Sequence, residues 1–366
     1  MVHDVWVEVD LSALKHNLQQ VRGLVGDGVK IMAVVKGNGF GHGYVEPARA
    51  FVEAGADAVA VTRLDEALIL RSGGINAPIL LFAPIQPDNA RDAVDAGLEM
   101  TVTSIELARS ISNAASELGK TAGVHVKVDT GMSRLGMQPE DVAGALAEMH
   151  DLPNLSIAGI YTHFATSAEQ GISHARAQLR KLTSLINELK NAGIGYGLAH
   201  AANSAATLRM PESRLDMVRP GTLLYGQYPS ASVPHSLDLK PTWRLKARVC
   251  EVKDLKSGSA VGYGREFTTR RASRTAVIPI GWSDGFTLTP EGPLYRQSAV
   301  RFALKRARRS LAVEINGRKA PVLGRVAMQM IVVDVTGIDG VRVGDEVTVP
   351  AMRIPTSPLI PRVYVQ

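Results

Sequence analysis

Eight short apolar runs, separated by longer amphipathic segments, constrain the fold of this chain more than any other feature. The runs occupy residues 31–35, 58–62, 79–82, 100–103, 124–128, 157–161, 198–202 and 217–221. Apolar runs that alternate with helical patterns indicate βα units and a parallel sheet. Eight such units close a (β/α)8 barrel within about 250 residues. We therefore predict an α/β fold with a TIM-like (β/α)8 barrel. A doubly wound sheet is the alternative, because the last two runs are weak strand candidates.

The first helix and the end of the barrel are also visible in the sequence. Residues 11–25 carry apolar side chains at helical spacing, and Asp10 is placed to cap that helix. A Pro- and Ser-rich stretch at 227–241 resembles a connector, and short β-like runs with little helical periodicity follow it. We predict a barrel domain over 11–232 and a mainly β domain over 1–10 plus 233–366. The alternating "VWVEVD" would be a strand of the second domain.

Composition excludes several classes of protein. The single cysteine, Cys250, rules out a disulfide framework and a thiolate metal cluster. No apolar run reaches the ~20 residues of a membrane span, and the charged N-terminus does not resemble a signal peptide. The basic runs at 268–274 and 301–310 lack interleaved aromatic residues, so we interpret them as solvated surface. We expect a cytoplasmic protein that binds neither nucleic acid nor membrane.

Polar residues stand where several predicted strands end. They are Lys36, Lys127 with Asp129, His163, Asn203 with Ser204, and Arg219. Each alone has an ordinary structural explanation, but in a parallel barrel these ends converge on one site. A desolvated lysine amine is a nucleophile, and its common partner is the aldehyde of pyridoxal 5′-phosphate (PLP). Later strand-end loops and Ser204 could supply donors to the phosphate, and the glycines of "KGNGFGHG" permit a sharp turn.

A family resemblance rests on these residues. "AVVKGNGFGHG" resembles the PLP-lysine signature of the fold-type III alanine racemases. Seven further motifs match the family in the same order, at 126–136, 159–167, 200–206, 217–226, 262–264, 278–286 and 320–336. The resemblance covers residues 4 to about 350. It implies a PLP-bearing barrel, a β domain, and a homodimer in which each active site is built from both subunits.

The resemblance also implies residue roles. Lys36 would hold PLP and act as the base for the D-enantiomer, and Tyr263 of the partner subunit would act as the base for the L-enantiomer. Met328 would contact the amino-acid substrate through its backbone. The remaining implied roles are Arg219 at the pyridine nitrogen, His163 beside the ring, Ser204, Gly221 and Thr222 at the phosphate, Arg134 at the substrate carboxylate, and Lys127 as a lysine often carbamylated to brace that arginine. The product would be D-alanine for peptidoglycan.

The chain departs from the family pattern around the entrance and the phosphate. Phe40 replaces a tyrosine whose hydroxyl touches the phosphate, and Gln329, Leu288 and Trp282 replace an aspartate, an arginine and a tyrosine. The C-terminal tyrosine motif has no counterpart, since Tyr364 is a poor substitute. Two alternatives therefore stay open. One is a racemase of broader specificity, for serine or basic amino acids, and the other is a PLP-binding protein without racemase activity.

Overall fold

The computed structural model describes residues 2–288 and 311–366. The chain divides into two compact units. One is formed by residues 10–242 together with Gln366, and the other by residues 1–9 and 243–365. Each unit is described by itself below. Within the described residues, no helix combines the length and the apolar character that crossing a bilayer would require.

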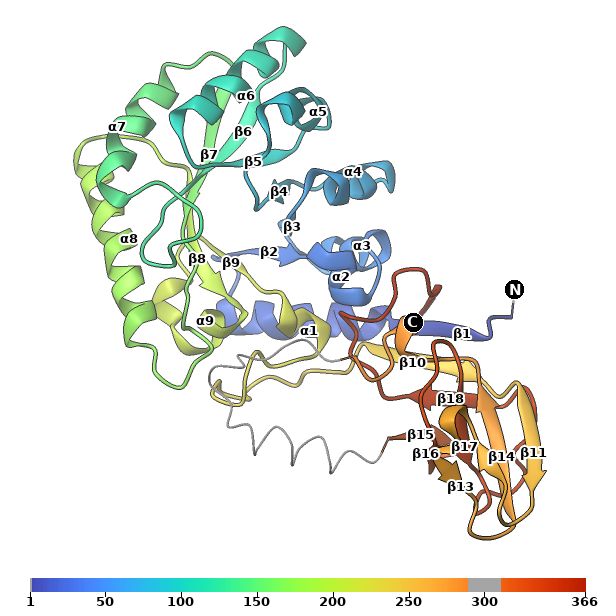
Figure 1. The fold of residues 1–366 in the computed structure, drawn as a ribbon. Coiled ribbons are helices and arrows are strands. Elements are labelled where there is room, and N and C mark those ends of the chain that lie inside the picture. Colours follow the sequence, from blue (N-terminus) through green and yellow to red (C-terminus); the bar gives the residue numbers. More distant parts are fainter. Residues whose placement is uncertain (1, 289–310) are drawn as a thin grey trace. The chain divides into compact units, whose positions relative to one another are not determined.

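The first unit is a closed barrel of eight parallel strands, as the eight apolar runs predicted (Figure 1). The strands follow one another around the barrel in chain order, and the last pairs with the first through Ile31 and Val218. They are β2 (Lys30–Val34), β3 (Ala58–Val61), β4 (Ile79–Leu81), β5 (Glu99–Val102), β6 (Ala122–Lys127), β7 (Leu155–Tyr161), β8 (Leu198–Asn203) and β9 (Met217–Arg219). The doubly wound alternative is therefore wrong.

Helices cover the outside of the barrel (Figure 1). They are α1 (Leu11–Val25), α3 (Val45–Glu53), α4 (Leu64–Ser72), α5 (Ala90–Asp95), α6 (Ile105–Leu118), α7 (Pro139–His150), α8 (Ser173–Asn191) and α9 (Ser204–Arg209). Helix α1 has its predicted bounds, and the Asp10 carboxylate accepts a hydrogen bond from the Ala13 backbone N–H at 2.8 Å. Such a bond satisfies one of the unpaired donors of the first helical turn. Inside the barrel, Met32, Leu80 and Met217 pack with small alanines in a buried cluster.

The second unit is built on a nine-stranded sheet. Its strand order is β11 (Glu251–Leu255), β14 (Ser273–Ile278), β17 (Ile331–Asp334), β16 (Arg318–Leu323), β15 (Ala312–Ile315), β18 (Glu346–Val349), β10 (Trp243–Arg248), β1 (Val5–Asp10) and β19 (Arg362–Val365). Strands β12 (Ala260–Val261) and β13 (Phe267–Thr268) form a separate pair. The N-terminal strand pairs antiparallel with β10, so "VWVEVD" belongs to this sheet. The second unit is thus mainly β, as predicted.

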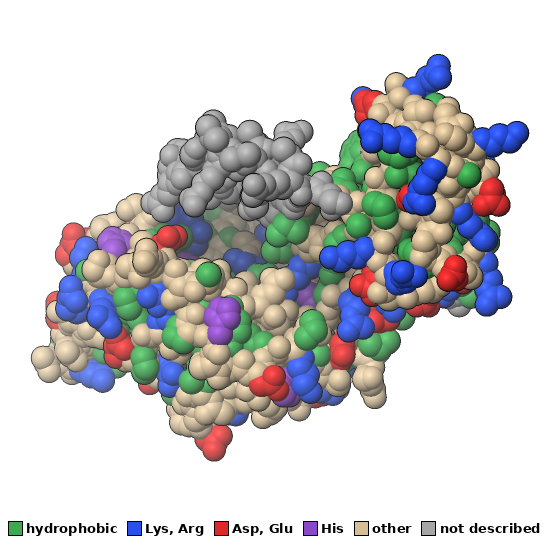
Figure 2. All heavy atoms as spheres, turned by 90° about the horizontal axis from the view of Figure 1, so that it is seen from below, with side chains coloured by type: hydrophobic (Ala, Val, Ile, Leu, Met, Phe, Trp, Pro, Cys, Tyr) green, Lys and Arg blue, Asp and Glu red, His purple; other side chains and the backbone are tan. Residues whose placement is uncertain are grey.

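The basic run at 268–274 lies in the β unit, and two of its three arginines have local partners. Arg271 lies 3.7 Å from the Asp334 carboxylate, and the Arg274 guanidinium donates to the Val341 carbonyl at 3.0 Å. Basic and acidic side chains are interspersed over the visible surface (Figure 2). These contacts agree with the interpretation of solvated surface. The other basic run, at 301–310, lies outside the described residues.

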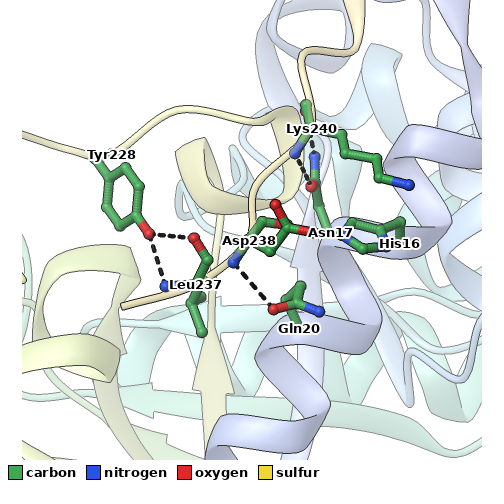
Figure 3. Close-up of polar contacts among 7 residues, drawn as sticks. All are labelled: His16, Asn17, Gln20, Tyr228, Leu237, Asp238 and Lys240. Carbon is green, nitrogen blue, oxygen red and sulfur yellow. Dashed lines mark hydrogen bonds and ion pairs between the residues drawn. The ribbon is translucent and has the colours of Figure 1, made fainter. Parts of the chain in front are cut away.

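The boundary between the units differs from the predicted one. The barrel unit ends at Thr242 rather than at residue 232, because the Pro- and Ser-rich stretch bonds to the barrel (Figure 3). The Asn17 amide on α1 accepts from the Lys240 backbone N–H at 2.8 Å and donates to its carbonyl at 2.9 Å. The Asp238 backbone N–H donates to the Gln20 side chain on α1 at 3.1 Å, and the Tyr228 hydroxyl bonds both backbone groups of Leu237 within the stretch itself. The composition of this stretch resembles that of a linker, but its hydrogen bonds to α1 make it part of the barrel unit.

Candidate active site

A cavity of about 520 Å³ lies in the barrel unit, and all the predicted polar strand-end residues except Asp129 line it. Its walls include all eight barrel residues that the sequence indicated: Lys36, Lys127, Arg134, His163, Ser204, Arg219, Gly221 and Thr222. Lys127 and Arg219 are the last residues of β6 and β9, and Ser204 directly follows β8. All of them therefore come from the carboxyl ends of the strands or the loops beyond, where barrel enzymes carry their sites.

The two other predicted site residues lie in the β unit. Tyr263 begins a short 3₁₀ turn (Tyr263–Arg265), and its side chain is 71% exposed. Met328 is 57% exposed. Every residue that lines the cavity belongs to the barrel unit. The described chain therefore brings eight of the ten predicted residues together and leaves Tyr263 and Met328 on an exposed surface of the other unit.

Lys36 is followed by a left-handed turn, which explains the glycines of this segment. The backbone φ angles of Gly37, Asn38, Gly39 and Phe40 are 61°, 56°, 56° and 52°, so the segment labelled α2 (Lys36–Gly41) is not a right-handed helix. Glycine adopts such angles at no steric cost, whereas residues with a Cβ disfavour them. The two glycines of this turn thus allow an abrupt left-handed path directly after the lysine.

The surroundings of Lys36 favour a neutral amine. Burial lowers the pKa of Lys36, and the nearby Arg134 cation lowers it further, while the Glu66 carboxylate acts in the opposite direction. A neutral amine carries the lone pair that attacks an aldehyde, so a lowered pKa makes Lys36 reactive at lower pH.

Glu66 is a site residue that the sequence reasoning missed. Its side chain lies on α4 and is buried, with 3% exposed. The carboxylate accepts hydrogen bonds from the Gly37, Thr62 and Arg63 backbone N–H groups at 2.9, 2.8 and 3.1 Å. A signal was present, because Glu66 lies four positions before the buried Leu70 and therefore on the same face of α4.

Arg219 lies at the start of a buried hydrogen-bonded chain. Its guanidinium is 2.9 Å from His200 Nδ1, His200 Nε2 is 2.9 Å from His125 Nδ1, and His125 Nε2 is 2.9 Å from the Glu99 carboxylate. Arginine can only donate, so His200 Nδ1 must accept and its Nε2 must carry the proton. The same argument makes His125 donate to Glu99. This series of hydrogen bonds therefore fixes the tautomers of both histidines. The sequence reasoning missed His200, His125 and Glu99.

Burial keeps the histidines of the site neutral. Burial, followed by the charge of Arg219, lowers the pKa of His163 to about 2 and lowers the pKa of His200 well below its usual range. Burial lowers the pKa of Arg219 to about 10, so this side chain remains a cation near neutral pH. Lys127 is almost fully buried, and burial followed by Arg219 and Arg134 lowers its pKa strongly. Both effects favour the uncharged amine of Lys127.

One end of the cavity has the donors that a phosphate needs. The Ser204 hydroxyl accepts from the Gly221 backbone N–H at 2.8 Å, which leaves the Ser204 proton available to an acceptor. The Thr222 hydroxyl oxygen is buried and has no hydrogen-bond partner among the residues that the structure describes. A Cβ on Gly221 would lie 3.0 Å from the Phe40 ring, which is closer than ordinary van der Waals contact, so a larger residue would crowd this wall. An unpaired hydroxyl, a serine and two arginines in one cavity fit the anionic groups of PLP.

A strand-end lysine, a buried arginine and an anion pocket on one (β/α)8 barrel, in a chain that also carries a β domain, define a PLP-dependent enzyme of the barrel class. Comparison with known proteins agrees with this class. The family described as alanine racemase matches through its N-terminal domain at residues 9–229 and its C-terminal domain at 242–357. The chain belongs to the alanine racemase family, a family of PLP-dependent isomerases.

Individual relatives match over nearly the whole chain. An alanine racemase of Methanococcus maripaludis is 41% identical over 95% of this chain and 89% of its own length. One of Desulforamulus reducens is 41% identical over 95% and 90%. The structure of a Clostridium difficile alanine racemase has a TM-score of 0.91 at 32% identity, covering 100% of this chain and 96% of that chain. A histidine racemase of Leuconostoc mesenteroides has a TM-score of 0.85 at 28% identity, covering 100% and 98%.

Proposed function

We propose that this protein interconverts L- and D-alanine, with PLP held on Lys36 and with two bases on opposite faces of the substrate. The observation that carries the proposal is the convergence of Lys36, Arg134 and Arg219 on one cavity with a phosphate-binding end. The relatives named as alanine racemases supply the substrate. D-alanine made in the cytoplasm for peptidoglycan would be the biological product.

The chain's own residues divide the work. When bound, PLP withdraws electrons from the substrate Cα and so acidifies its proton. Ser204 and the backbone of Gly221 and Thr222 would hold the phosphate, and Arg134 would hold the substrate carboxylate. Arg219, a cation that can only donate, would pair with the ring nitrogen and leave it unprotonated. His163 stays neutral beside the ring because of its burial.

Proton transfer needs a base on each face of Cα. Lys36 would remove the proton of the D-enantiomer, because its lowered pKa leaves a larger fraction of neutral amine. Tyr263 would remove the proton of the L-enantiomer. Since Tyr263 is exposed on the β unit, we propose that it serves the cavity of a second copy, in a homodimer with shared active sites. Met328 would contact the substrate from the same unit.

Lys127 would brace the carboxylate-binding arginine after reaction with CO₂. A neutral amine attacks CO₂ and releases a proton, which gives an anionic carbamate. Burial lowers the pKa of Lys127 and so favours its neutral amine, and Arg134 and Arg219 are cations that lower this pKa further and would stabilise the negative product. We therefore propose carbamylation at this residue.

A test of the proposal combines two inactive variants. Purified protein with added PLP should racemise alanine, as followed by chiral chromatography. Lys36→Ala and Tyr263→Phe should each abolish racemisation, and Tyr263→Phe should keep the visible absorbance of lysine-bound PLP. Co-expression of the two variants should restore activity, because a mixed dimer has one cavity with both bases. Absence of activity in the wild type would refute the function, and absence of restoration would refute sharing between subunits.

A racemase of broader specificity is the second candidate. The likeness to a histidine racemase favours it, as do Gln329, Leu288 and Trp282, which are exposed on the β unit where the family has charged or hydroxyl-bearing residues. Serine, histidine and lysine tested beside alanine in the same assay would separate the two candidates. A PLP carrier without activity is less well supported, because the match to the family's C-terminal domain includes Tyr263.

A further inference from the structure

The two carboxylate oxygens of Glu66 serve two different segments. Oε2 accepts from the backbone N–H groups of Thr62 and Arg63, the two residues directly before α4. Oε1 accepts from the Gly37 backbone N–H at 2.9 Å and from the Tyr44 hydroxyl at 3.0 Å. A glutamate at this helical position commonly caps its own helix, and Oε2 does so. Oε1 instead bonds the turn that directly follows Lys36.

We propose that Glu66 is a positioning residue for Lys36: it fixes the left-handed turn and places a negative charge beside the amine. Gly37 is the residue next to Lys36, so a bond to its N–H restricts the backbone that aims the lysine side chain. The turn also contains Asn38 and Phe40 with positive φ. Residues other than glycine adopt such angles only when surrounding contacts hold them, and a charge-assisted bond from a buried carboxylate is such a contact.

The charge of Glu66 has a measurable effect on the pKa of Lys36. Glu66 raises the pKa of Lys36 against the larger effects of burial and Arg134. Removing its charge should therefore lower the amine pKa and leave more neutral amine at a given pH. Loosening of the turn should at the same time slow reaction of that amine. The other titratable groups lining the cavity are Lys127, Tyr161, His163 and Arg219, and Tyr44 and Arg63 contact Glu66.

The inference rests on the proposed function in one respect, since it takes Lys36 to be the residue that binds PLP. The experiment therefore follows PLP attachment rather than racemisation. The full chain is freed of cofactor and mixed with PLP over a pH series. The rate at which the visible absorbance of lysine-bound PLP appears is recorded at each pH. Borohydride reduction followed by peptide mass analysis verifies that Lys36 carries the label.

Three variants separate charge from position. Glu66→Gln should move the midpoint of the rate profile to lower pH and lower its high-pH plateau by about tenfold, because small misplacement of a reacting group has effects of this order. Glu66→Asp keeps the charge but shortens the reach, so its plateau should fall while its midpoint stays. Tyr44→Phe removes one donor and leaves the carboxylate in place, so it should change both quantities little.

The outcomes are distinguishable. A Glu66→Gln profile equal to that of the wild type, or a lower plateau with an unmoved midpoint, overturns the inference while the proposed function stands. A wild type that takes PLP on Lys36 but does not racemise amino acids refutes the function and leaves the inference intact. Label on another residue refutes both. If Glu66→Gln does not fold, a Glu66→Asp profile with an unmoved midpoint and a lowered plateau supports the inference, and an unchanged plateau overturns it.

Discussion

Lowering the pH should destabilise the folded barrel through His163 and His200. The pKa of His163 falls from 6.5 to about 2 on folding, mainly because the side chain is buried. The pKa of His200 is also well below 6.5. Protonated His200 would direct an N–H at the guanidinium of Arg219, which already donates to it. Below an unfolded pKa of about 6.5 the unfolded chain binds these protons and the folded chain does not. Stability is therefore lost as the pH falls.

The magnitude follows from this linkage. Each histidine that binds a proton only on unfolding lowers the free energy of unfolding by about 1.4 kcal/mol per pH unit below its unfolded pKa. At pH about 5, roughly 1.5 units below that value, His163 contributes a loss of about 2 kcal/mol. His200, whose pKa is also lowered, adds a loss in the same direction. A loss of about 2 kcal/mol is already a sizeable part of the ~5–15 kcal/mol that stabilises a typical domain.

The assay is urea unfolding of the wild type, His163→Gln and His200→Gln over a pH series from mildly alkaline to about 5. Carboxylates also titrate here, so the informative quantity is the difference in unfolding free energy between wild type and variant. As the pH falls, that difference should shrink by about 2 kcal/mol for His163→Gln, and it should also shrink for His200→Gln. Thr162→Val removes a buried hydroxyl that does not titrate, and its difference should be constant. A constant difference for both histidine variants would refute the reasoning.

Two further predictions concern the barrel loops and Lys127. Gly136→Ala should destabilise the barrel by about 2–4 kcal/mol, since φ is +125° and a Cβ would lie 2.6 Å from the Asp129 nitrogen. Gly144→Ala in α7, where a Cβ meets nothing within 4 Å, should instead stabilise the barrel by about 0.5–1 kcal/mol. The midpoints of urea unfolding of the two variants and the wild type test both predictions. Wild-type protein depleted of CO₂ should lose racemase activity and regain it with bicarbonate, whereas Lys127→Met should not respond. Equal wild-type activity without CO₂ and with bicarbonate would contradict carbamylation.

The strands and the first helix were predictable because their signals are local. An apolar run that ends at a polar residue marks a strand wherever its partners lie, and all eight runs became barrel strands. Asp10 caps α1 through its own neighbour three residues away. The strand-end rule then placed Lys36, Lys127 and Arg219 around one cavity. These inferences need only the chain order and the geometry of a parallel barrel.

What the sequence did not reveal depends on contacts between distant segments. His125 and His200 are 75 positions apart, and each taken alone is a polar residue inside an apolar strand. Which strand residues face each other depends on the stagger of the barrel, which the pattern of a single strand does not contain. The connector was misplaced for the same reason, since Asn17 bonds Lys240 across 223 positions. The glycines indicated a turn after Lys36, but they did not reveal that Asn38 would share its left-handed conformation.

The charges of the cavity explain how one site can hold both a reactive amine and a permanent cation. Its described lining includes Lys36, Lys127, Arg134 and Arg219 and no acidic side chain. A carboxylate in direct contact with Arg219 would cancel its charge, but the nearest acid along its hydrogen-bonded chain, Glu99, lies beyond two neutral imidazoles. Arg219 is thus oriented without being neutralised, and its positive charge, after burial, helps to lower the pKa of Lys127. The excess of cations is then satisfied by anionic ligands, which a phosphate and an amino-acid carboxylate would provide.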